Sequence, residues 1–242
     1  MIKNLGIYFN KIVEKNKNNI AVKIDVNNQY SYLELNILSE KFIIYLKSLK
    51  LKSKDHILIE SKKNIYSYAI LIACLKLGIS YSFIDITQAP KRIEKIIKRV
   101  NAKKVILYNE AVKTKNSLYL SDKKIEKILV NRIKTNHKIK NISNIAYIMF
   151  TSGSTGEPKG VKISHSNLFY LIKWSKKFFK INNKSVFSNL NPLHFDNSVF
   201  DIYCSLFNSA SIVPVQKNEF FYFGKLIRRL NELNCNIWFS VP

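Results

Sequence analysis

Two hydrophobic patterns alternate along the chain. Short apolar runs are typical of strands buried in a parallel sheet, whereas apolar residues at three- and four-residue spacing are typical of helices that pack one face. The apolar runs predict strands at residues 21–25, 56–60, 81–85, 105–108 and 146–150. A helical pattern follows most of these strands. This order predicts an α/β fold of mostly parallel sheets flanked by helices.

Several expected helices carry start or stop signals. Ser31 and Glu34 have the spacing of a capping box, in which the hydroxyl and the carboxylate bind amides at a helix start. The buried stripe of that helix is expected to be Leu35, Leu38, Phe42, Leu46 and Leu49. Residues 65–77 are apolar on nearly every face, as expected of a helix packed on a sheet, and Gly78 should end it. Pro90 suits the first turn of another helix.

Composition limits the classes of function. A chain of 242 residues with 47% hydrophobic content can bury a full core, as one large α/β domain or two fused lobes. The net charge of +24 brings nucleic acids into consideration, because lysine and arginine release counterions from phosphates. Only five of the 40 basic residues are arginines, however, and no recognition helix or aromatic platform is evident. We therefore expect no specific nucleic-acid partner.

No apolar stretch reaches the length of a bilayer span, because the longest one ends at Lys76. No signal-peptide core is evident either, so we expect a cytoplasmic protein with no membrane partner. The three cysteines, Cys74, Cys204 and Cys235, lie far apart in apolar segments. We expect neither a disulfide nor a metal site from them.

The densest cluster of small and hydroxyl residues lies at 151–160, directly after an expected strand. Glycines allow a positive φ angle and close approach of the backbone to an anion, and we expect this also of Gly160. The hydroxyls add hydrogen-bond donors, and the lysine adds a positive charge. The residues expected to bind nucleotide phosphates are Thr151, Ser152, Gly153, Ser154, Thr155, Gly156 and Lys159. The order is not a Walker loop, because Pro158 and Gly160 break that pattern, and a P-loop NTPase is disfavoured. A flexible turn without a ligand is the alternative.

Residues 146–168, AYIMFTSGSTGEPKGVKISHSNL, resemble the phosphate loop and following helix of the adenylate-forming (AMP-binding) superfamily. This superfamily contains acyl-CoA synthetases, luciferases and nonribosomal peptide synthetase adenylation domains. Residues 30–36 and 74–97 resemble two structural elements of those adenylation domains, with Ser82 and Ile86 in place of two prolines. The resemblance implies that ATP and Mg²⁺ are the cofactors, and that the loop contacts the triphosphate and the leaving pyrophosphate.

Residues 195–215 resemble the family element F-D-x-S-V-x-E-I, with Asp201 in place of Glu. In amino-acid-activating members, the Asp that matches Asp196 holds the α-ammonium group of the substrate. A carboxylate in a mostly apolar pocket would pair with that cation and select amino acids, so Asp196 and Phe195 are the candidate substrate-binding residues. From the residues alone, Asp196 could equally cap the helix expected near Ser198. The element also resembles D-alanine:carrier-protein ligases, which favours a small amino acid.

The resemblance implies ATP-dependent activation of an amino acid as an aminoacyl-adenylate, followed by transfer to the thiol of a phosphopantetheinyl carrier protein. An acyl- or aryl-CoA ligase of the same superfamily is the second hypothesis, and a noncatalytic binding protein is the third. Residues 1–242 correspond to an incomplete AMP-binding N-terminal domain. The family's adenine-, ribose- and metal-binding segments and its small C-terminal domain with the catalytic lysine lie beyond the match. The resemblance thus implies no complete catalytic set in this chain, and we expect the chain alone to form no adenylate and to bind ATP weakly.

Overall fold

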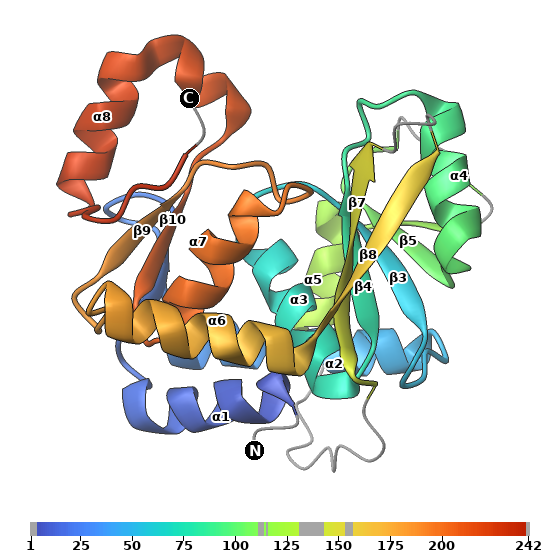
Figure 1. The fold of residues 1–242 in the computed structure, drawn as a ribbon, viewed down its shortest axis with the longest axis horizontal. Helices are drawn as coiled ribbons and strands as arrows, with labels where there is room; N and C mark the ends of the chain where they lie inside the picture. Colours follow the sequence, from blue (N-terminus) through green and yellow to red (C-terminus); the bar gives the residue numbers. More distant parts are fainter. Residues whose placement is uncertain (1–3, 111–113, 115, 131–142, 153–156, 241–242) are drawn as a thin grey trace.

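Two β-sheets organise the molecule (Figure 1). The computed structural model describes residues 4–110, 114, 116–130, 143–152 and 157–240. The four-stranded sheet has the order β2 (Gln29–Ser31), β1 (Ile20–Lys23), β10 (Ser211–Pro214) and β9 (Val186–Asn189). The six-stranded sheet has the order β6 (Ser117–Tyr119), β5 (Lys104–Leu107), β3 (His56–Glu60), β4 (Ser80–Ile84), β7 (Ile145–Ser152) and β8 (Pro158–Ser164).

The strand pairing is mostly parallel, as the sequence predicts. Antiparallel pairs join β1 to β2 and β7 to β8, and the other pairs between the described strands are parallel. The five expected strands are all present, with ends displaced by at most two residues. The sequence analysis did not anticipate β8, whose burial pattern is mostly exposed and therefore gives no apolar run.

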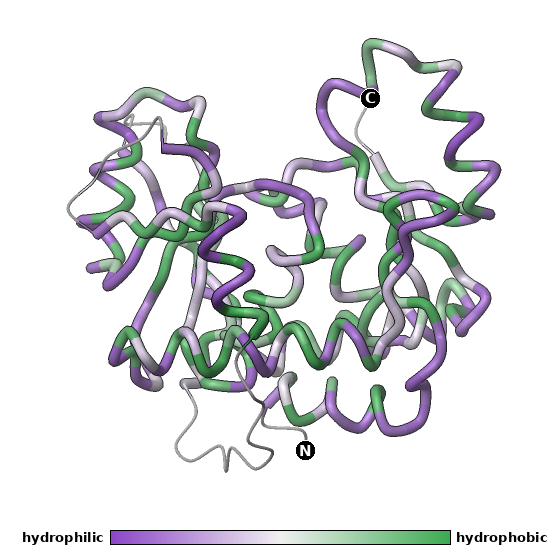
Figure 2. Tube along the Cα trace, turned by 180° about the vertical axis from the view of Figure 1, so that it is seen from behind, coloured by the Kyte–Doolittle hydropathy of each residue, from purple (hydrophilic) through white to green (hydrophobic). Residues whose placement is uncertain are grey.

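Helices cover the sheets and separate them. They are α1 (Leu5–Asn16), α2 (Tyr32–Ser48), α3 (Ile65–Leu77), α4 (Pro90–Val100), α5 (Asp122–Val130), α6 (His165–Phe178), α7 (Asn197–Leu206) and α8 (Phe223–Glu232), with a short 3-10 helix, η1 (Lys217–Tyr222), before α8. The largest buried cluster draws on both sheets and on α1, α2, α3, α6 and α7, so the sheets share one core. Figure 2 shows long hydrophobic stretches through the middle of the molecule. In the described residues, no helix is both long and apolar enough to cross a bilayer.

The expected helix signals are confirmed. The Ser31 hydroxyl accepts a hydrogen bond from the Glu34 amide, and the Glu34 carboxylate accepts one from the Ser31 amide, which completes the capping box of α2. Helix α3 is buried on nearly every face and ends at Gly78 with φ of 67°. Pro90 occupies the first turn of α4. These boundaries follow from local chemistry alone.

Helix α1 approaches α3 closely because Gly6 lacks a side chain. A Cβ atom at Gly6 would lie 2.5 Å from the Cα atom of Lys76. The Lys76 side chain is buried, and its ammonium group lies 2.6 Å from the Glu40 carboxylate and donates to Asn36 and Ser39 on α2. This contact fixes three helices against one another beneath the sheets.

Candidate functional site

The loop after β9 meets the carboxyl ends of β3 and β4. Nδ1 of His194 lies 3.2 Å from Oγ of Ser61, which follows β3. Nε2 of His194 lies 4.0 Å from Oδ2 of Asp85, which follows β4. Ligand sites in open α/β sheets lie at the carboxyl ends of strands. This edge, which joins the two sheets, is therefore the candidate site.

His194 is poised as a neutral hydrogen-bonding group at this edge. Burial lowers the pKa of its imidazole, Asp85 opposes that effect, and the positive charges of Arg92 and Lys63 add to it. The ring of Phe195 packs against the imidazole with centroids 4.5 Å apart. The sequence analysis did not identify Ser61 and Asp85 as site residues. The one feature that could have indicated them is that each directly follows an expected strand.

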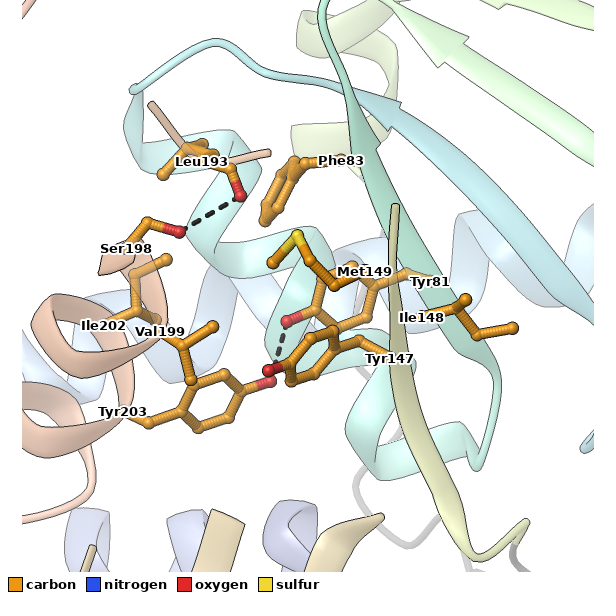
Figure 3. Close-up of a pocket in the computed structure, with 10 residues that line it drawn as sticks. All are labelled: Tyr81, Phe83, Tyr147, Ile148, Met149, Leu193, Ser198, Val199, Ile202 and Tyr203. Atoms are coloured by element: carbon orange, nitrogen blue, oxygen red, sulfur yellow. Dashed lines mark hydrogen bonds between the residues drawn. The ribbon is translucent and has the colours of Figure 1, made fainter. Parts of the chain in front are cut away.

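A small cavity lies between the six-stranded sheet and α7 (Figure 3). Its walls are Tyr81 and Phe83 of β4, Tyr147, Ile148 and Met149 of β7, Leu193, and Ser198, Val199, Ile202 and Tyr203 of α7. The phenol groups of Tyr81 and Tyr203 are 2.7 Å apart, and burial raises the pKa of both, so they remain neutral. The cavity measures about 10 Å³, roughly the space of one water molecule.

Asp196 lies at the amino end of α7, outside this cavity. The expected apolar pocket around its carboxylate is wrong, because a turn in which the Phe195 amide donates to the Pro192 carbonyl leaves the side chain exposed. Asp196 makes no side-chain capping hydrogen bond either. Burial, and then the charge of Asp196, raise the pKa of Tyr147, which lines the cavity. Asp196 precedes Ser198 of the cavity wall by two residues in the chain, and Phe195 beside it is 54% exposed.

The hairpin of β7 and β8 carries the hydroxyl-rich segment. Thr151 pairs with Lys159 across the hairpin, and both side chains are exposed. Ser152 pairs with Pro158 through the same ladder. Four expected phosphate-binding residues lie outside the described residues: Gly153, Ser154, Thr155 and Gly156. After the loop the chain continues as a strand rather than a helix, which differs from a Walker loop.

The glycine and the acidic residue flanking this loop have specific packing roles. Gly160 lies in β8 opposite Phe150 and does not have positive φ, contrary to expectation. A Cβ atom there would lie 3.0 Å from the Ile148 side chain, so Gly160 permits close strand packing instead. Glu157 forms an exposed ion pair with Lys95 of α4, with 2.5 Å between the charged atoms. This pair partly neutralises the one acidic group in the segment.

Lys63 anchors the loop after β9. Its buried ammonium group donates to the carbonyl oxygens of Asn189, Leu190 and Val215 at 2.8, 2.6 and 2.7 Å. Burial lowers the pKa of Lys63 to about 8, against the opposing charges of Asp201 and Glu219. Lys63 follows β3, whereas the carbonyls follow or end β9 and β10. One side chain therefore ties the carboxyl ends of both sheets together.

Asp201 holds the same loop from α7. Its Oδ2 atom accepts hydrogen bonds from Asn189 at 3.0 Å and Asn191 at 3.4 Å, while its buried Oδ1 has no partner among the described residues. Burial raises the pKa of Asp201 to about 7, although Asn189, Asn191 and the charge of Lys63 oppose the shift. Neither Lys63 nor this role of Asp201 was predicted.

Comparisons with known proteins agree with this architecture. Residues 9–242 match the family described as AMP-binding enzyme. The chain is 30% identical over 231 residues to the L-proline--[L-prolyl-carrier protein] ligase of Pseudomonas fluorescens, covering 90% of this chain and 46% of that protein. It is 30% identical over 223 residues to a D-alanine--D-alanyl carrier protein ligase of Listeria monocytogenes, covering 88% and 43%. The chain thus spans less than half the length of these relatives.

A solved structure also shares the fold. The Klebsiella oxytoca NpsA N-terminal subdomain superposes with a TM-score of 0.86 at 19% identity, covering 99% of this chain and 62% of that one. Nearly every described element therefore has a counterpart in that subdomain.

Proposed function

Because the chain belongs to the AMP-binding enzyme family, we propose that it supplies part of a ligase that activates an amino acid with ATP. One observation carries the proposal. Tyr147 and Met149 line the cavity, and Thr151 continues the same face of β7 to the hairpin tip, beside Lys159. The lining of the cavity and the hydroxyl-rich hairpin thus lie along one strand, which supports the proposal of an acyl site next to a polyphosphate site.

In the proposed reaction, a carboxylate oxygen of the amino acid forms a bond to the α-phosphorus of ATP. The bond from that phosphorus to the bridging oxygen breaks, and pyrophosphate leaves with the electron pair. The carboxylate is already ionised at neutral pH, so no general base is required and His194 need only donate or accept a hydrogen bond. Lys159 and the hydroxyl of Thr151 would hold the charge of the polyphosphate.

Mg²⁺ bound to ATP would supply further charge neutralisation. Among the residues that the structure describes, no three or more His, Cys, Asp and Glu side chains gather as a metal site. We assign no step to the ion.

The chemistry of Asp196 supports an amino acid as the substrate. Its exposed carboxylate lies on the turn before Ser198 and Val199 of the cavity wall, and we propose that it pairs there with an α-ammonium group whose carboxylate faces the hairpin. The relatives named for L-proline and D-alanine act on amino acids and carrier proteins. We accordingly propose that the aminoacyl-adenylate passes to a carrier-protein thiol. The exposure of Asp196 favours the alternative of an acyl- or aryl-CoA ligase, since none of the described residues that line the aromatic cavity carries a charge.

The test is ATP–pyrophosphate exchange in this chain joined to the part of the Pseudomonas ligase that follows its match. Amino acids, including L-proline and D-alanine, would be compared with aryl and fatty acids. Lys159→Ala should lower exchange by about tenfold to a hundredfold through lost charge stabilisation. Lys162→Ala is the matched control, because Lys162 is an exposed lysine of the same strand, farther from the hairpin tip.

Asp196→Ala separates the two enzymatic hypotheses. Loss of amino-acid-dependent exchange in this variant, with Lys162→Ala unaffected, would support activation of amino acids. Exchange driven by aryl or fatty acids and unchanged in Asp196→Ala would instead establish the acyl-CoA ligase alternative. If no acid of either class promotes exchange in the completed protein, the noncatalytic hypothesis stands in place of both.

A further inference from the structure

An exposed aromatic turn leads from β10 into α8. Residues 220–223 are Phe, Phe, Tyr and Phe, in η1 and at the start of α8, and we call them the aromatic knuckle. Their exposed fractions are 44% for Phe220, 80% for Phe221, 64% for Tyr222 and 57% for Phe223. Figure 1 shows this segment at the top of the view, above β9 and β10, and Figure 2 shows hydrophobic residues along it. The aromatic knuckle therefore projects into solvent.

The elements beneath the aromatic knuckle are already packed and anchored. Helix α8 buries its leucines against residues of β9 and β10. The guanidinium group of Arg229 donates to the carbonyl oxygens of Ile24 and Pro214, and it lies 2.7 Å from the carboxylate of Glu219. The packing of α8 thus does not use the four rings. Large apolar groups that stay exposed on an anchored turn mark an interaction surface.

The charges around the aromatic knuckle are positive. Three exposed cations flank it: Lys217, Lys225 and Arg228. None of the three forms an ion pair within the part of the chain that the structure describes. Glu219 is the one acidic residue between positions 216 and 231, and Arg229 already pairs with it. The Nζ atom of Lys225 lies 5.3 Å from the centroid of the Tyr222 ring, so the cations and the rings are contiguous.

This combination of rings and cations matches an anionic lipid surface. Aromatic side chains are enriched where lipid headgroups meet the acyl chains, and lysine and arginine are attracted to an anionic leaflet. A 3-10 helix has three residues per turn, so consecutive aromatic residues of η1 point to different sides of its axis. The groove of a protein accepts one face of a helix, whereas a fluid lipid layer surrounds an inserted group. Rings on several sides therefore favour lipid over protein as the partner.

We propose that the aromatic knuckle inserts into the interfacial layer of an anionic phospholipid membrane, with the three flanking cations on the headgroups. The expectation of no membrane partner rested on the length of chain that crosses a bilayer, and surface insertion needs no such length. The side chain of Gln216, just before η1, donates to the Lys63 carbonyl, so the aromatic knuckle adjoins the edge that carries the candidate site. Membrane binding turns that edge towards the lipid.

The test must separate insertion of the rings from adsorption of a chain with a net charge of +24. In a Trp174→Phe, Trp238→Phe background, one tryptophan is introduced by Tyr222→Trp or, as the matched control, by Tyr170→Trp on α6. Tyr170 is 59% exposed, close to the 64% of Tyr222. Vesicles contain phosphatidylcholine alone or equal parts of phosphatidylcholine and phosphatidylglycerol. Brominated acyl chains quench an indole that enters the lipid layer, and circular dichroism checks the fold of each variant.

In the vesicles with phosphatidylglycerol, brominated chains should quench the fluorescence of Tyr222→Trp and leave that of Tyr170→Trp nearly unchanged. In the chain with its own tryptophans, Phe221→Ser should weaken vesicle binding by about tenfold, because it removes one inserted ring at constant charge. Phe178→Ser is the control, at a position of α6 that is 67% exposed, and it should leave vesicle binding unchanged.

The cations are tested in the same way. Lys225→Gln combined with Arg228→Gln should weaken binding to the anionic vesicles by about thirtyfold, since each cation near the leaflet adds to the affinity. Lys176→Gln combined with Lys177→Gln makes the same change of net charge at exposed positions of α6, and it should have a much smaller effect. Vesicles of phosphatidylcholine alone should bind the chain weakly.

Equal quenching of the two introduced tryptophans, or equal losses from the two serine variants, would overturn the inference, because adsorption through net charge would then explain the binding. Self-association in the absence of vesicles that Phe221→Ser abolishes would identify a second copy of the chain as the partner and also overturn it. These readouts need neither nucleotide nor amino acid. Absence of pyrophosphate exchange in the completed protein would therefore sink the proposed function alone, and absence of insertion would sink this inference alone.

Discussion

Replacing Asp201 by Asn should remove a large contribution to the pH dependence of folding. The carboxyl group is fully buried in α7, and one of its oxygens lacks a partner among the described residues. Burial raises its pKa from 3.8 to about 7. Between these values the folded protein binds more protons than the unfolded chain does. The stability that the protonated group contributes at low pH is therefore lost as the pH rises through this window.

The magnitude follows from the two pKa values. For a pKa of about 7 in the folded state and 3.8 in the unfolded chain, the free energy of unfolding should fall by roughly 2.5 kcal/mol between pH 5 and pH 8. Asp201→Asn keeps the size of the side chain and removes its titration. His56 and His165 have pKa values lowered to about 4 and give the opposite slope, but both proteins share that contribution. The contribution of the two histidines therefore cancels when the unfolding free energies of the two proteins are subtracted.

The assay is urea unfolding of both proteins at several pH values and constant ionic strength, with extrapolation to water. The difference in unfolding free energy between the wild type and Asp201→Asn should decrease steadily from pH 5 to pH 8. Asp196→Asn makes the same change of charge at an exposed position beside the same helix, and it should not reproduce that decrease. Parallel curves for wild type and Asp201→Asn would refute the reasoning, because they would mean that the Asn side chains and Lys63 keep the carboxylate ionised throughout.

Four further substitutions test packing and helix capping by the same urea measurements. Lys63→Met should cost roughly 3 kcal/mol or more, since it leaves three buried carbonyls without their donor; a loss below about 1 kcal/mol would contradict the anchoring role. Gly6→Ala should cost about 1–3 kcal/mol because its methyl group would meet the Lys76 backbone. Gly224→Ala in α8, with no atom within 4 Å, should be neutral or stabilising by up to about 1 kcal/mol, so equal losses for the two glycines would exclude the clash. Ser31→Ala should cost about 1 kcal/mol through loss of the cap of α2, and unchanged stability would show that the capping box is dispensable.

For much of the candidate site, the sequence predicts which residue types take part but not how they are arranged in space. The hydroxyls, glycines and lysine at 151–160 predict a phosphate loop because they are consecutive in the chain, and the structure pairs Thr151 with Lys159 across the β7–β8 hairpin. Asp196 was found by the same kind of pattern. The sequence pattern did not predict that the Asp196 side chain is exposed, because its direction depends on the turn before α7.

The residues that support the site left little local signal. Lys63 looks like any other lysine of this basic chain, and its burial depends on three carbonyls that lie far along the sequence. Ser61, Asp85 and His194 come together only because the loop after β9 crosses to the ends of β3 and β4.

The sequence by itself determined several helix ends, the positions of five strands and the α/β class. Helix caps and strand periodicity depend on hydrogen bonds and side-chain directions within a few residues, so each of these signals is complete in a short segment. Only the tertiary structure decided that β1 pairs with β10, that Lys63 and Asp201 hold one loop from two sides, and that Asp196 is exposed. Those outcomes depend on which distant strands pair and on the desolvation that follows, and neither quantity is a property of any one segment.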